Sequence, residues 1–155
     1  MLLHAIRTQV LSAAVVIALV ASAPACAAFY MRIATIRGES MDPRHLGWIE
    51  LQSFKRSRDE IAITKALDKS SVDLETAFVS GSHLGSAMID ETCPNGASHM
   101  TTTLIDPVVS KFSTVTAGGG PLDAMTLKYR TISVVAGKPC VGPIPQTPRA
   151  SPHHH

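Results

Sequence analysis

Aromatic residues are scarce in this chain: of 155 residues, one is Trp, two are Tyr and four are Phe. The net charge is also small, because the 14 Lys and Arg residues are nearly balanced by 12 Asp and Glu residues. There is no basic stripe with interleaved aromatic side chains, which argues against nucleic-acid binding. The glycine run at 118–120 is followed by no Lys-Ser/Thr pair, so it predicts a flexible loop and not a phosphate-binding loop. The length favours a single domain with a core that needs no metal.

Recognisable catalytic and metal-binding patterns are also missing. None of the 3 cysteines has a second ligand at the short spacing typical of zinc sites. Ser82 and His83 do not lie in the Gly-x-Ser-x-Gly pattern of a nucleophile elbow. Asp42 and His45 are an acid–base pair by residue type, but they fall in a turn, where they are better explained as loop-fixing groups; His99 falls within an expected strand. We therefore predict a protein that is not an enzyme, with no catalytic residue, cofactor or metal.

The first 28 residues have the layout of a secretory signal peptide. Arg7 supplies positive charge, residues 10–20 form an apolar run, and residues 21–28 are mostly small. The apolar run is shorter than the roughly 20 residues of a membrane-spanning helix. Cleavage after residue 25, 27 or 28 fits this pattern. Cys26 leaves a lipoprotein as an alternative, although no aliphatic residue stands at the usual place before it. The chain is thus expected to be exported, and to be periplasmic or secreted.

Export would decide which cysteines remain in the mature chain and whether they can form a disulfide. Cleavage after residue 27 or 28 removes Cys26 and leaves Cys93 and Cys140. In an oxidising compartment two thiols can pair. The residues alone leave two alternatives open, a Cys93–Cys140 disulfide or two unrelated free thiols.

The rest of the chain is mainly β with one short helix. Alternating apolar and polar residues predict strands at 29–37, 48–54, 61–67, 84–90, 98–105, 108–115 and 125–130, with a charged turn at 55–60. A helix is expected to begin at Ser70, which can cap it together with Asp73 three residues further on. The helix is expected to end at Gly81. Leu74 and Phe78 lie on its apolar face. Proline and glycine after Val135 predict a disordered tail at 137–155.

Three segments in order carry a resemblance to a known family. The first is the loop and strand at 38–54, with Trp48, the only tryptophan, at the strand entrance. The second is the strand-to-helix junction at 65–74, followed by the helix exit at 81–83, and the third is the strand at 121–127. Together these resemble the Hcp family, the haemolysin-coregulated proteins that form the inner tube of type VI secretion systems. The resemblance covers residues 31–135 and rests on these structural positions: Gly38, Glu39, Ser40, Asp42, His45, Trp48, Asp68 and Ser70.

The resemblance implies a small β-barrel of two packed antiparallel sheets with one short α-helix, over residues 29–136. It also implies a homo-oligomer, a hexameric ring that stacks into a tube, with effector proteins or the spike protein as partners. The chain is then a tube subunit, or a secreted effector or effector carrier. The signal peptide supplies the alternative, because type VI tubes are built in the cytoplasm. In that alternative the chain is an exported periplasmic or secreted binding module that kept the fold and builds no tube, with no membrane contact after cleavage.

Overall fold

A computed structural model describes residues 28–140 of the chain. The predicted signal peptide, except for Ala28, and residues 141–155 of the predicted tail lie outside the described residues. The elements in chain order are β1 (Ala28–Ile33), β2 (Ile49–Leu51), β3 (Ser53–Arg56), β4 (Glu60–Ala66), α1 (Ser70–Ser80), β5 (Ser86–Thr92), β6 (Ser98–Ile105), β7 (Val108–Ala117), β8 (Gly120–Lys128) and β9 (Thr131–Ala136).

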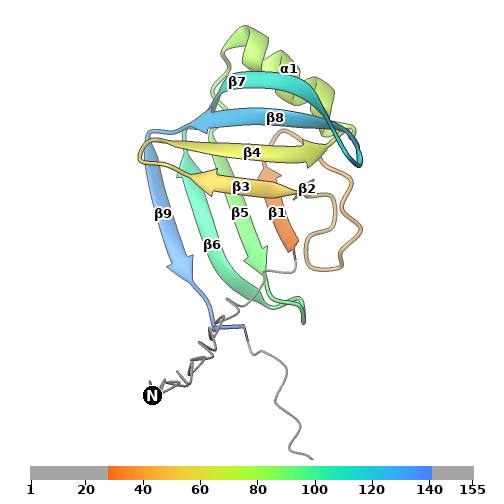
Figure 1. Ribbon diagram of the computed structural model, residues 1–155. Coiled ribbons are helices and arrows are strands. Elements are labelled where there is room, and N and C mark those ends of the chain that lie inside the picture. Colours follow the sequence, from red (N-terminus) through yellow and green to blue (C-terminus); the bar gives the residue numbers. More distant parts are fainter. Residues whose placement is uncertain (1–27, 141–155) are drawn as a thin grey trace, which may run out of the picture.

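The strands form two antiparallel sheets. Sheet A has the order β2-β1-β5-β6-β9 and sheet B the order β3-β4-β8-β7. The strands of sheet B run across the upper end of sheet A, and α1 lies beside β7 (Figure 1). This arrangement confirms the prediction of two packed antiparallel sheets with one short helix.

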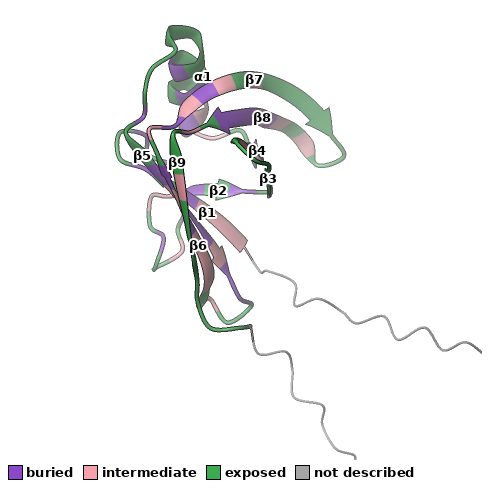
Figure 2. Ribbon diagram, turned by 90° about the vertical axis from the view of Figure 1, so that its left-hand side faces the viewer, coloured by how far each residue is buried: buried purple, intermediate pink, exposed green. Residues whose placement is uncertain are grey.

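The core fills the space between the two sheets. Met31, Ile49 and Ile89 face it from sheet A, and Ile61 and Leu127 face it from sheet B, all fully buried. Buried residues lie along β5 and β8 and at several positions of α1 (Figure 2). Alternation along each strand leaves the opposite faces available for other contacts.

The predicted strand at 48–54 is in fact two strands in different sheets. Ile49 and Leu51 face the core from β2, and Phe54 packs against the same core from β3. Gln52 stands between them, and its N–H donates to the Thr64 carbonyl of β4 at 2.8 Å. The hydrophobic alternation continues through this corner, so the pattern could not reveal that the chain changes sheets there.

The helix ends as predicted but begins differently. Gly81 adopts the left-handed conformation, with φ of 63°, which confirms it as the stop signal. The expected cap at Ser70 is wrong: the N-cap position is Lys69 and carries no side-chain cap hydrogen bond. Asp68 accepts hydrogen bonds from both the N–H and the hydroxyl of Ser70 instead. On the apolar face Leu74 is buried, while Phe78 remains 37% exposed.

Other departures concern segment ends. The first strand ends at Ile33 and not at residue 37, and the glycine run forms a tight β7–β8 hairpin, with Gly120 at φ of 115°. A separate strand, β9, follows Arg130 and pairs with β6. The first residues of the predicted tail are held, because Gly137 N–H donates to the His99 carbonyl at 2.7 Å. No helix in the described part is long and apolar enough to cross a membrane.

Candidate functional site

The loop between β1 and β2 folds back on itself. Gly38 N–H donates to the Gly47 carbonyl at 2.9 Å, and Ser40 N–H donates to the Trp48 carbonyl at 3.0 Å. A Cβ added at Gly38 would meet the Trp48 carbonyl oxygen at 2.3 Å. Glycine is therefore required at position 38 by close approach of backbone to backbone. Glu39, next in the predicted motif, is exposed.

His45 fixes this loop to sheet A. Its side chain is almost fully buried, and its ring stacks on Tyr30 of β1 at 4.2 Å between centroids. Nδ1 lies 2.8 Å from the Asp42 carboxylate, and Nε2 lies 2.6 Å from the Asp90 carboxylate of β5. Trp48 closes the cluster edge-on, at 4.9 Å from the His45 ring.

The geometry of His45 suits a tether better than a general base. Both ring nitrogens face carboxylates, so neither is free to take a proton from a substrate. A neutral imidazole donates from one nitrogen only; both bonds therefore form together only if the ring is doubly protonated or one carboxyl keeps its proton. Asp90 also accepts hydrogen bonds from Ser98 and Thr101. The hydrogen bond from His45 lowers the pKa of Asp42 below its usual value.

A second polar cluster joins α1 to sheet B. The ammonium of Lys65 has no exposed surface and lies 2.9 Å from Asp68 Oδ1 and 3.0 Å from Asp123 Oδ2. It also donates to Ser71 Oγ at 3.1 Å, and Ser71 in turn donates to Asp123. Ser71 further accepts the N–H of Asp68. The cluster thus ties β4, β8 and the first turn of α1 through one buried cation.

The predicted motif residues therefore fall into two structural clusters. Gly38, Glu39, Ser40, Asp42, His45 and Trp48 lie in the loop between β1 and β2. Asp68 and Ser70 lie at the Lys65 cluster. Sequence reasoning missed Lys65, Asp90 and Asp123. One signal was present: Lys65 follows Ile61 and Ile63 at the inward positions of β4, where a charge needs a buried partner.

The other candidate catalytic residues stand apart. The Ser82 hydroxyl contacts Ser80, while His83 is exposed and contacts Asp106 at 2.8 Å. His99 contacts the Lys138 carbonyl at 3.3 Å. In the described residues these contacts do not bring a nucleophile, a base and an orienting carboxylate together.

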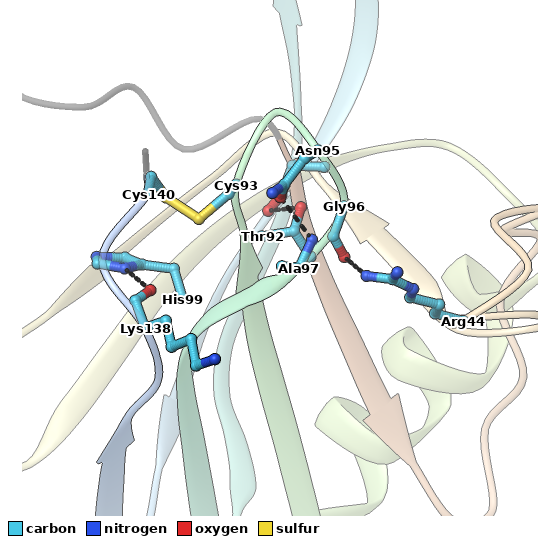
Figure 3. Close-up of a disulfide and its surroundings, with 10 residues drawn as sticks. Arg44, Thr92, Cys93, Asn95, Gly96, Ala97, His99, Lys138 and Cys140 are labelled. Carbon is cyan, nitrogen blue, oxygen red and sulfur yellow. Dashed lines mark hydrogen bonds between the residues drawn. A yellow bond between two sulfur atoms is a disulfide. The ribbon is translucent and has the colours of Figure 1, made fainter. Parts of the chain in front are cut away.

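The structure joins Cys93 and Cys140 by a disulfide, with 5.3 Å between the two Cα atoms (Figure 3). Cys93 begins the turn between β5 and β6, and Cys140 follows β9. The same turn contacts the His45 loop, because Arg44 Nη1 donates to the Gly96 carbonyl at 2.5 Å. One turn thus connects the loop and the carboxy-terminal segment.

A surface cavity of about 500 Å³ lies beside Trp48. Its lining includes Arg32, Arg37, Leu46 and Met88. The Arg32 guanidinium lies 5.4 Å from the centroid of the Trp48 ring. The cavity is therefore lined by both apolar and cationic side chains.

Comparison with known proteins agrees with this fold. The family model described as "Type VI secretion system effector, Hcp" matches residues 55–135, and the chain belongs to this family. No curated protein sequence matches the chain.

Solved structures of Hcp proteins share the fold at low sequence identity. Hcp1 from Salmonella typhimurium superposes with a TM-score of 0.64 at 20% identity, covering 69% of this chain and 84% of that one. The secreted protein Hcp3 from Pseudomonas aeruginosa gives 0.62 at 22% identity, with coverage of 70% and 90%. A type VI secretion system effector from Yersinia pestis gives 0.62 at 16% identity, with coverage of 68% and 86%.

Proposed function

We propose that this chain is a ring-forming subunit or effector carrier of a type VI secretion system. The observation that carries the proposal is family membership over residues 55–135, combined with sheet edges suited to self-association. Within the described residues β9 pairs with β6 alone and ends sheet A. It carries Val134 and Val135, which are 43% and 63% exposed.

An edge strand with exposed valines favours pairing with another chain. A contact between this edge and a different surface of a second copy is heterologous, and repeated heterologous contacts end only when they close into a ring. The hexameric ring is the closed form that the family resemblance implies. The partners are then further copies of the chain in the ring, together with effector proteins that the ring carries or the spike protein at its end.

Light scattering coupled to size-exclusion chromatography, followed by negative-stain microscopy, tests assembly of the mature chain. We expect six-membered rings at high concentration and their loss in Val135→Lys, because a lysine on an edge strand blocks pairing. Val72→Lys is the matched control, since Val72 is 68% exposed but lies on α1, away from the β9 edge. A strict monomer at millimolar concentration, or equal loss of rings in both variants, contradicts this assembly.

Two observations favour the second candidate, an exported binding module. The amino-terminal pattern predicts export, and the cavity beside Trp48 offers a partly apolar, cationic surface. Amino-terminal sequencing of protein from outside the cell is expected to give a start between residues 26 and 29. An intact Met1 there would exclude the signal peptide and remove the main support for this candidate.

A further inference from the structure

Three side chains with metal-binding chemistry meet at the end of sheet A. The sulfur atoms of Cys93 and Cys140 and one ring nitrogen of His99 all lie within 4.8 Å of one another. His99 comes from β6, Cys93 from the preceding turn and Cys140 from the segment after β9 (Figure 3). The fold brings them together, because His99 and Cys140 lie 6 and 47 positions after Cys93 in the sequence.

We infer that reduction of the disulfide converts this cluster into a site for a borderline or soft metal ion such as Zn²⁺. Two thiolates and one imidazole are typical zinc ligands, and three protein ligands leave one tetrahedral position for water or another ligand. The reduced and oxidised chains thus hold the segment after β9 in two ways, by a metal or by the disulfide.

One ring nitrogen of His99 lies within 4.8 Å of both cysteine sulfurs, which supports its role as a ligand. Its Nδ1 lies 3.3 Å from the Lys138 carbonyl, which accepts a hydrogen bond only if Nδ1 carries the proton. In that tautomer the lone pair is on Nε2. A ligand histidine typically donates its other N–H to a carbonyl or carboxylate, so the Lys138 carbonyl fixes the ring when Nε2 binds the ion. His99 and Cys140 are partly exposed while Cys93 is buried, so an ion reaches the cluster from one side.

The chemical balance is simple. A dithiol reductant gives two electrons and two protons to the Cys93–Cys140 disulfide and becomes a disulfide itself. The two protein thiols then release their protons when the metal binds, because thiolates are the ligands. Metal binding therefore depends on reduction and lowers the pH of an unbuffered solution.

The experiment is a titration of Co²⁺, with Zn²⁺ in competition, into the full chain before and after reduction. Cys26 and the three terminal histidines carry further groups of metal-ligand type, so the starting chain carries Cys26→Ser and alanine at positions 153–155 to remove them from the titration. Cobalt reports thiolate ligation by its charge-transfer absorption and tetrahedral geometry by intense visible bands. The reduced chain is expected to bind one equivalent with both signals, and the oxidised chain none.

Two variants test whether His99 is a metal ligand. His99→Ala, and His99→Gln in case the first misfolds, are expected to weaken binding by at least about tenfold, since even outer-shell partners of a ligand contribute about 10- to 100-fold. His83→Ala is the control, because His83 is exposed and contacts Asp106. Equal binding by the oxidised and reduced chains overturns the inference. So does affinity that is unchanged by both His99 variants, or absence of thiolate-to-cobalt absorption.

Discussion

Replacing Lys65 by methionine tests how the helix is attached to the barrel. The ammonium of Lys65 is fully buried and lies within 3.0 Å of both the Asp68 and Asp123 carboxylates. Methionine has a similar length but no charge, so Lys65→Met leaves two partly or fully buried carboxylates without their cation. Removing one partner of a buried ion pair typically costs about 3–5 kcal/mol of unfolding free energy. Since a domain is stable by only about 5–15 kcal/mol, we expect a large effect.

Urea unfolding, followed by circular dichroism with the disulfide intact, measures this cost. The midpoint should fall while the slope stays unchanged, and the melting temperature should drop by roughly 12 °C or more. Lys55→Met on neighbouring β3 is the control, because Lys55 is exposed and its loss should change stability by less than about 0.5 kcal/mol. If the two variants lose similar stability, the Lys65 cluster does not anchor the helix. In Lys65→Met/Asp123→Leu, the non-additive coupling between the two sites should exceed about 1 kcal/mol.

Three further predictions concern the loop and the disulfide. Gly38→Ala should cost about 1–3 kcal/mol by overpacking against the Trp48 backbone, while Gly118→Ala, with open space around it, should be nearly neutral in the same urea titration. The lowered pKa of Asp42 means that its contribution to stability is present above the unfolded pKa and is lost as pH falls through the folded value. Unfolding midpoints measured from pH 6 to pH 2.5 should therefore fall less in Asp42→Asn than in wild type. An equal fall of the midpoint with decreasing pH in both proteins would contradict this. Cys93→Ser should cost roughly 4 kcal/mol on the chain-entropy estimate, and alkylation followed by mass spectrometry should find no free Cys93 thiol in the oxidised wild type.

The sequence predicted those parts of the fold that depend on local patterns. Alternation located most strands, and the positive-φ requirement at Gly81 located the end of the helix. The corner at Gln52 was missed because the inward positions continue through it without a break. The strand β9 was not recognised as separate from β8, because its edge position leaves most of its residues exposed and its alternation weak.

The candidate site was predictable only in part, for a related reason. Asp42 and His45 are three residues apart, so their contact is local and could be anticipated as loop-fixing. The Asp90 partner of His45 and the Asp123 partner of Lys65 come from other strands, 45 and 58 positions away. Such pairs depend on strand order and register, which one sequence does not specify.

The proposed function requires that this Hcp family member takes part in a type VI secretion system. The most direct measurement compares the protein outside cells that have a working type VI apparatus with the protein outside matched cells that lack it. Equal expression and a cytoplasmic marker control for synthesis and lysis. We expect extracellular protein to disappear when the apparatus is lost. Equal amounts outside both kinds of cell would contradict it and support the exported binding module.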